Sequence, residues 1–172
     1  MLKKLLPIIL FAFPLFAQQN PMDQNQFMLA ESYEQKGDFN KAVEIIETLN
    51  KKDPSNIQYF NKLNSLYLQL KKYDESVLLI NSRILISPQD ISLYGMLGST
   101  YYTAGDRTKA YFVWDDAAEK YKTNQMTYRV IANYAIDKRD FEKAIELLNK
   151  GKEITKDPYL YSYDLAELYN IT

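Results

Sequence analysis

The sequence predicts an all-α protein built from repeated antiparallel helix hairpins. From Asp23 onward it divides into segments of 34 residues, 23–56, 57–90, 91–124 and 125–158, and a fifth segment spans 159–172. Large and small residues return at fixed places in these segments. The seventh residue is Leu29, Leu63, Leu97, Ile131 and Leu165, and the eleventh is Tyr33, Tyr67, Tyr101, Ala135 and Tyr169. A fixed period of this length, without insertions, is typical of a helical repeat array.

The first segment shows why each unit should form two helices. Asp23 is a candidate cap, with Gln26 three residues later, and a helical stripe of Leu29, Ala30 and Tyr33 follows. Gly37 suits the left-handed end of that helix, and Asp38 is a candidate cap for the next one. The second helix is predicted from a stripe that ends before Pro54, namely Ala42, Val43, Ile45, Ile46 and Leu49.

The eighth and twentieth residues of each segment are expected where the two helices of a hairpin cross. They are small in three units: Ala30 with Ala42, Gly98 with Ala110, and Ala132 with Ala144. The second unit instead has Asn64 and Ser76. Buried polar groups lower stability unless they are hydrogen-bonded, so we expect this hairpin to be the weakest of the four.

These positions carry a family resemblance over residues 23–172. The chain resembles tetratricopeptide repeat proteins, and the third segment matches their pattern at Tyr94, Leu97, Gly98, Tyr101, Ala110, Trp114 and Ala117. Pro54 and Pro88 also match, whereas Lys122 replaces a proline, Pro158 comes two residues late, and Gly151 stands at a place for an Ala-like residue. The resemblance implies a right-handed superhelix of four hairpins and a terminal helix, with the first helix of each unit lining a concave groove.

Residues 1–17 are predicted to be a secretory signal peptide, followed by a short tail at 18–22. Lys3 and Lys4 precede the apolar run 5–16, and Ala17 ends it before a polar stretch. As a membrane anchor this run of 12 residues is short, because a spanning helix needs about 20. We therefore expect cleavage, no stable membrane span afterwards, and a periplasmic or secreted location.

The composition argues against most enzyme chemistry. The chain has no Cys and no His, and its five Gly are dispersed. Zinc sites of Cys and His, thiol nucleophiles, His-based triads and Gly-rich phosphate loops are therefore not expected. We predict no enzyme activity and no cofactor. Without residues 1–17 the chain has 19 basic and 22 acidic residues and no basic stripe, so nucleic acid is not an expected partner.

Groove positions follow from the resemblance, because residues two, five, nine and twelve of each unit lie on one stripe of the first helix. The candidate binding residues on that stripe are Phe27, Glu31, Asn61, Ser65, Ser99, Tyr102, Arg129 and Asn133. Tyr102 and Arg129 are expected to hold a partner, with Gly95 and Ser99 leaving space beside them. The family's clamp for a terminal carboxylate needs cations at places occupied here by Phe27 and Glu31, or by Asn61 and Ser65, so we predict no such clamp.

The leading functional hypothesis is an exported scaffold that binds a protein or peptide segment in its groove. One alternative is a cell-envelope glycan or cell-wall binder that uses exposed tyrosines, and another is a structural spacer of a longer polypeptide. Seven of the 15 tyrosines occupy repeat positions, which favours a packing role for them. The last helix, expected from Pro158 to Thr172, is apolar almost all round, which predicts self-association or continuation of the chain.

Overall fold

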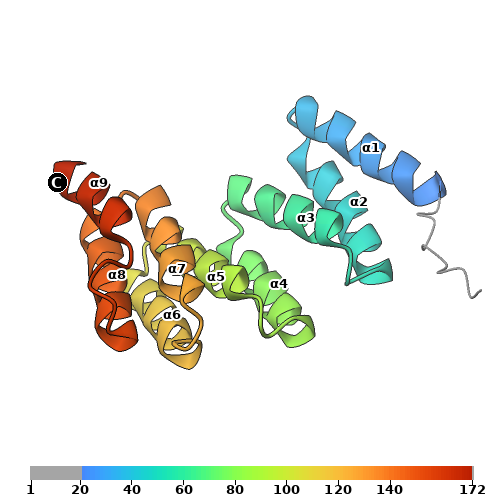
Figure 1. Ribbon diagram of the computed structural model, residues 1–172. Coiled ribbons are helices and arrows are strands. Elements are labelled where there is room, and N and C mark those ends of the chain that lie inside the picture. The colour runs from blue at the N-terminus through green and yellow to red at the C-terminus, as the bar shows by residue number, and fades with distance from the viewer. Residues whose placement is uncertain (1–20, 172) are drawn as a thin grey trace, which may run out of the picture.

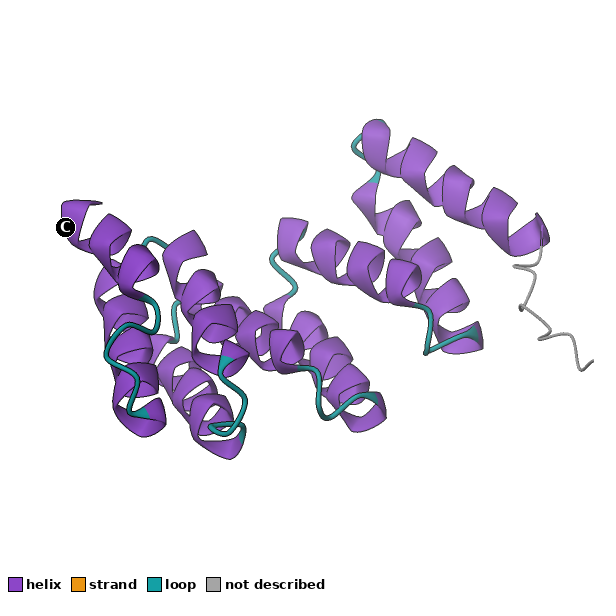
Figure 2. Ribbon diagram, in the orientation of Figure 1, coloured by secondary structure: helices purple, strands orange, loops and turns teal. Residues whose placement is uncertain are grey.

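A computed structural model describes residues 21–171. In this part of the chain every element is an α-helix, which confirms the predicted fold class (Figure 2). The predicted signal peptide lies outside the described residues. The helices follow one another along an elongated array with α1 and α9 at opposite ends (Figure 1). Their bounds are α1 Pro21–Gln35, α2 Phe39–Lys52, α3 Ile57–Gln69, α4 Tyr73–Ile86, α5 Ile91–Thr103, α6 Arg107–Lys120, α7 Met126–Asp137, α8 Phe141–Thr155 and α9 Ser162–Ile171.

The second helices of the four hairpins begin at regular intervals of 34 residues, at Phe39, Tyr73, Arg107 and Phe141. Each hairpin turn contains the same type of backbone hydrogen bond. The amide before the second helix bonds back to the carbonyl five residues earlier, as in Asp38 N to Tyr33 O at 2.8 Å and Asp140 N to Ala135 O at 2.9 Å. Such a helix end needs one residue in the left-handed conformation.

That left-handed residue is Gly37, Lys71, Gly105 or Arg139, with φ of 78°, 56°, 93° and 58°. Glycine adopts this backbone without a steric penalty, whereas a residue with a Cβ is disfavoured by about 1 kcal/mol. Lys71 and Arg139 therefore carry local strain that the other two turns avoid.

Three sequence-based predictions about helix ends are wrong. Asp23 does not cap α1, which begins at Pro21; its carboxylate instead pairs with Lys52 at 2.6 Å. Asp38 makes no cap bond and pairs with Lys41 at 2.7 Å. The terminal helix begins at Ser162 and not at Pro158, because residues 157–161 form a turn.

The hairpin of α5 and α6 is held by Trp114, whose side chain is fully buried. A Cβ placed on Gly98 would lie 2.2 Å from the indole nitrogen, so only glycine lets the ring lie this close to α5. The indole also donates a hydrogen bond to the carbonyl of Gly95 at 3.0 Å. Gly151 has a related role in α8, where a Cβ would lie 2.8 Å from both the Tyr128 and Tyr161 rings. This contact explains the absence of an Ala-like residue at that place.

The core is divided into three clusters along the array. One joins α1, α2 and α3, a small middle cluster joins α3, α4 and α5, and the third spans α5 to α9. Among the first helices α5 and α7 pack closely, whereas α3 makes few contacts with α1 or α5. The second repeat is joined to its neighbours through α2 with α3 and through α4 with α5, while its own helices α3 and α4 share the least contact of the four hairpins.

The polar crossing in this repeat is nevertheless satisfied by hydrogen bonds. The Ser76 hydroxyl donates to Asn64 Oδ1 at 2.6 Å and lies 3.4 Å from the Thr100 hydroxyl of the next unit. Asn64 Nδ2 lies 3.4 Å from Met96 Sδ, and Thr100 donates to the Met96 carbonyl at 3.0 Å. These buried side chains therefore link α3, α4 and α5 in one network.

This network makes Asn64 and Ser76 energetically dependent on each other. Ser76→Ala leaves Asn64 Oδ1 buried without its donor, and we expect a loss of about 1–3 kcal/mol in the free energy of unfolding. Asn64→Ala with Ser76→Ala removes both groups, while Thr100 keeps its bond to Met96. The double variant should therefore lose less than the two single variants together, as measured by urea unfolding in a double-mutant cycle. Strictly additive losses would contradict the coupling.

Candidate functional site

The predicted binding residues lie on the first helix of each hairpin, that is, on α1, α3, α5 and α7. We call the side of these four helices that carries the predicted residues the first-helix surface. Asn61, Ser65 and Asn133 are exposed on it, and Ser99 is half-buried. Phe27 instead packs against the Tyr59 ring, with the ring centroids 5.8 Å apart. Polar and accessible side chains therefore dominate this surface at its centre.

Two of the predicted positions are engaged within the fold. Glu31 lies 3.6 Å from Lys62 Nζ, which also contacts Glu34 at 2.8 Å, so this lysine of α3 is shared by two carboxylates of α1. Gly95 does not leave open space, contrary to the sequence-based prediction. A Cβ there would lie 2.1 Å from Tyr134, because the tyrosine ring of α7 fills the hollow.

Tyr102 lies in a polar pocket of about 380 Å³, which we call the Tyr102 pocket. The pocket lies where the end of α5 meets the start of α6 and the turn before α8. Its lining residues are Tyr102, Arg107, Tyr111, Arg139, Asp140, Phe141 and Glu142. The cavity is therefore formed jointly by α5 and α6 of the third repeat and by the turn before α8 in the fourth repeat.

An aromatic group forms the inner wall of this pocket. The Tyr102 and Tyr111 rings stack on Trp114, with centroid distances of 6.1 Å and 6.2 Å. The Tyr111 hydroxyl donates a hydrogen bond to Asp140 Oδ2. The other carboxylate oxygen, Asp140 Oδ1, caps α8 because it accepts a hydrogen bond from Lys143 N at 3.2 Å. Burial and the bond to Asp140 raise the pKa of Tyr111 to about 12. The hydroxyl therefore remains a neutral donor near neutral pH.

Tyr102 has a similar environment. Burial raises the pKa of its hydroxyl; Asp140 adds to the rise, whereas Arg107 opposes it. The Arg107 guanidinium lies over the Tyr102 ring, 5.0 Å from its centroid. Behind the pocket the buried Lys143 pairs with Asp115 at 2.8 Å and with Glu146 at 2.9 Å. One lysine thus faces two carboxylates behind the pocket, so this cluster keeps a net negative charge.

Arg129 lies apart from the Tyr102 pocket, near the start of α7. It is half-buried, and its Nη2 lies 3.5 Å from Met126 Sδ. The structure therefore does not place the two predicted anchors in one cavity. The residues that accompany Tyr102, namely Arg107, Tyr111 and Arg139, were not predicted, because they belong to second helices and turns. The signal for Arg139 was its place in the turn where other units carry Gly.

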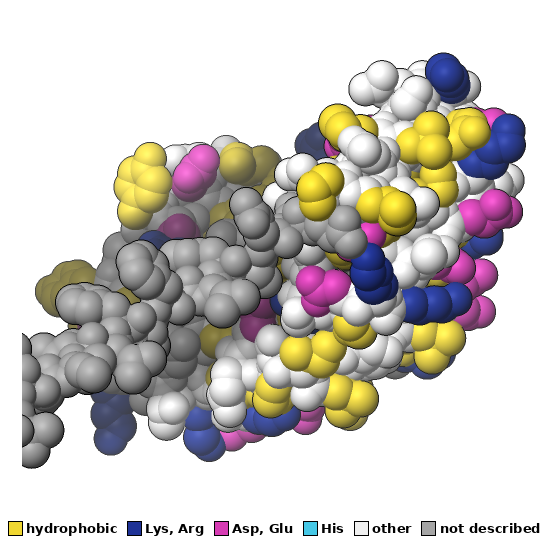
Figure 3. All heavy atoms as spheres, turned by 90° about the vertical axis from the view of Figure 1, so that its right-hand side faces the viewer, with side chains coloured by type: hydrophobic (Ala, Val, Ile, Leu, Met, Phe, Trp, Pro, Cys, Tyr) yellow, Lys and Arg dark blue, Asp and Glu magenta, His cyan; other side chains and the backbone are white. Residues whose placement is uncertain are grey.

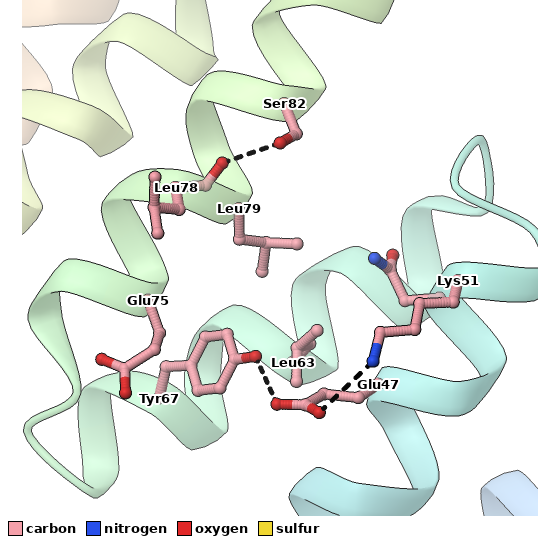
Figure 4. Close-up of a pocket in the computed structure, with 9 residues that line it drawn as sticks. Glu47, Lys51, Leu63, Tyr67, Glu75, Leu78, Leu79 and Ser82 are labelled. Atoms are coloured by element: carbon pink, nitrogen blue, oxygen red, sulfur yellow. Dashed lines mark hydrogen bonds and ion pairs between the residues drawn. The ribbon is translucent and has the colours of Figure 1, made fainter.

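A second cavity, the α2–α4 cleft, has a volume of about 270 Å³ and lies among α2, α3 and α4 (Figure 4). Tyr67 donates to Glu47 Oε1 at 2.7 Å, and Lys51 lies 4.0 Å from Glu47 Oε2. Leu63 lies at its buried base, while Leu78 is 68% exposed. Asn50 also lines this cleft, and its Oδ1 is buried without a hydrogen-bond partner, so the cleft combines apolar leucines with one unused acceptor.

Two further features of the described helices concern metal binding and membrane insertion. In residues 21–171 there is no group of three or more Asp or Glu side chains placed to hold a metal ion. Within the same range, no helix has the length and apolar character that crossing a membrane requires.

The chain is similar to several known proteins. Residues 8–82 match the family model for subunit 3 of the anaphase-promoting complex, or cyclosome. A TPR repeat-containing protein of Methanocaldococcus jannaschii is 30% identical over 143 residues, which cover 83% of this chain and 23% of that protein. BBS4, a BBSome complex member of Bos taurus, is 26% identical over 159 residues, covering 88% of this chain and 28% of that protein. The chain thus spans about a quarter of the length of these relatives.

Similarity extends to a solved structure. The crystal structure of MamA protein superposes with a TM-score of 0.50 at 18% identity, covering 86% of this chain and 81% of that one. At this level of identity the likeness concerns the fold alone. Together with the regular hairpins described above, the comparisons show that this chain has the superhelical helical-repeat fold, and its sequence is similar to that of a TPR repeat-containing protein.

Proposed function

We propose that this chain is a non-enzymatic interaction scaffold that binds a protein or peptide segment along the first-helix surface. Helical repeats of this type present an extended surface to a partner. The observation that carries the proposal is the Tyr102 pocket, which is polar, partly aromatic and formed where two repeats meet. Half-buried Ser99 lies three residues before Tyr102 and thus on the same side of α5, so the pocket adjoins the first-helix surface. Nucleic acid is not among the partners that we propose.

A glycan is a weaker candidate for the Tyr102 pocket. Sugar recognition by aromatic residues uses an accessible ring face. The Tyr102 ring already stacks on Trp114 and lies beneath the Arg107 guanidinium. A sugar would have to displace a contact that the fold has made, whereas a peptide can use the hydroxyl and the guanidinium groups at the pocket edge.

Site-specific crosslinking tests which surface the partner uses. A photoreactive amino acid is placed at Ser65, Ser99 or Asn133 on the first helices, and at Phe112, which is 71% exposed on α6, as a control. We expect partner crosslinks from the first-helix positions, reduced by Tyr102→Phe, which keeps the ring packing and removes the hydroxyl. Tyr102→Ala is unsuitable because it also removes the stack on Trp114. Crosslinks confined to Phe112 would overturn the proposal.

We also propose that the protein is exported and acts in the periplasm or outside the cell. The proposal rests on the charged start, the apolar run and the small residue at the end of residues 1–17. Mass spectrometry of the protein recovered from an envelope or culture fraction should find an N-terminus at Gln18. A mature chain that still starts at Met1 and stays in the cytoplasm would be incompatible with export.

Self-association through α9 is a further part of the proposal. Leu165 and Leu168 pack on the array, but Tyr163 and Ile171 remain 82% and 55% exposed. In the part of the α1 end that Figure 3 shows, hydrophobic side chains lie between charged and other polar ones. The exposed side chains of α9 can bury their apolar area against a second copy of the same helix, in a two-fold contact.

Sedimentation velocity over a concentration series tests this contact. The unmodified protein should form dimers, and Tyr163→Ser with Ile171→Ser should shift it to monomers without loss of helical signal. A protein that remains monomeric at all concentrations before substitution would exclude association through α9.

A further inference from the structure

We propose that the Tyr102 pocket recognises an acidic side chain, an aspartate or glutamate, of the bound segment. This inference rests on the proposed function and adds the chemical class that the pocket selects. It is carried by two guanidinium groups, from Arg107 and Arg139, that line one cavity from different repeats.

Neither arginine is neutralised by a carboxylate. Among residues 21–171 the ion pairs involve lysines only, and neither Arg107 nor Arg139 is in one. Arg107 lies over the Tyr102 ring, and Arg139 is exposed in the turn before α8. An arginine fork binds a carboxylate through two parallel hydrogen bonds, so two unpaired forks at one cavity favour an anionic group.

The acidic residues of the pocket do not cancel this preference. Asp140 is already bonded to the Tyr111 hydroxyl and to the backbone N–H of Lys143. Lys143 is paired with Asp115 and Glu146 behind the pocket. Glu142 is exposed and makes no ion pair in the described part of the chain. Hydrogen bonds from neutral donors leave Asp140 its negative charge, so the lining carries two positive and two negative groups. The preference for a carboxylate therefore rests on the N–H donors of the two arginines, which no carboxylate of the described chain uses, and the exposed Glu142 is the acidic group whose effect can be tested.

The backbone at Arg139 supplies a matched control. Arg139 occupies the left-handed turn position that Gly37 and Gly105 fill elsewhere, and Lys71 occupies the same position in the second repeat. Replacing either residue by Gly relieves the same strain. Arg139→Gly therefore removes a guanidinium while raising the unfolding temperature, and Lys71→Gly raises the unfolding temperature without touching the pocket.

The experiment measures binding of an acetylated, amidated tetraglutamate peptide to the isotope-labelled full chain by NMR at low salt. Tetraglutamine and tetralysine serve as comparison probes. We expect tetraglutamate to shift the amide signals of Tyr102, Arg107 and Arg139, and tetraglutamine to shift them far less. Arg139→Gly and Arg107→Gln should each weaken binding about fivefold, since a partly exposed pair is worth about 1 kcal/mol. Lys71→Gly should leave the affinity unchanged.

Glu142→Gln tests the inference through an expected rise in affinity, whereas the arginine variants test it through a loss. Removing this carboxylate should tighten tetraglutamate binding about twofold, because one repulsive charge is lost. Equal binding of tetraglutamate and tetraglutamine, or equal loss in Lys71→Gly and Arg139→Gly, overturns the inference. Tetralysine binding that Glu142→Gln weakens also overturns it, in favour of a basic ligand. In all these cases crosslinking from Ser99 and Asn133 still decides the proposed function independently.

Discussion

The structure depends on the close contact between the Trp114 ring and helix α5 at Gly95 and Gly98. The absence of a side chain at Gly98 allows the ring to lie against the helix, and the indole N–H fixes its orientation through the Gly95 carbonyl. Tyr102 and Tyr111 then stack on the fixed ring. The aromatic wall of the Tyr102 pocket is therefore a direct continuation of hairpin packing, and its rigidity comes from the core.

The repeat period made the fold predictable, because it is recorded in residues that pack locally. Leu63, Leu97 and Ile131 recur at one place in the unit, and each is buried in a cluster that joins neighbouring helices of the array. The pocket was less predictable, since Tyr102, Arg107 and Arg139 meet only when two repeats stack. Gly95 shows the same limit: the sequence reveals a missing side chain, but not that Tyr134 from the next unit fills the space.

The second repeat solves the crossing problem in a different way from its neighbours. Where α5 and α6 use a small residue and a large ring, α3 and α4 use Asn64 bonded to Ser76, and Thr100 extends this contact into the next unit. A hydrogen-bonded crossing is directional, whereas apolar packing is not. The polar link lies between the same helices as the apolar cluster of Phe60, Ile80, Leu93 and Leu97, so both kinds of contact join the second repeat to the third.

The hairpin turns show how repeats separate the requirements of folding from those of binding. All four turns need one left-handed residue, and glycine meets that need with least strain. Lys71 and Arg139 meet it at a cost, but with different surroundings: Lys71 is exposed and lines none of the cavities described above, whereas Arg139 lines the Tyr102 pocket beside Arg107. Strain by itself therefore does not identify a binding residue. Our proposal for Arg139 rests on its sharing a cavity with a second guanidinium, since no carboxylate of the described chain pairs with either group.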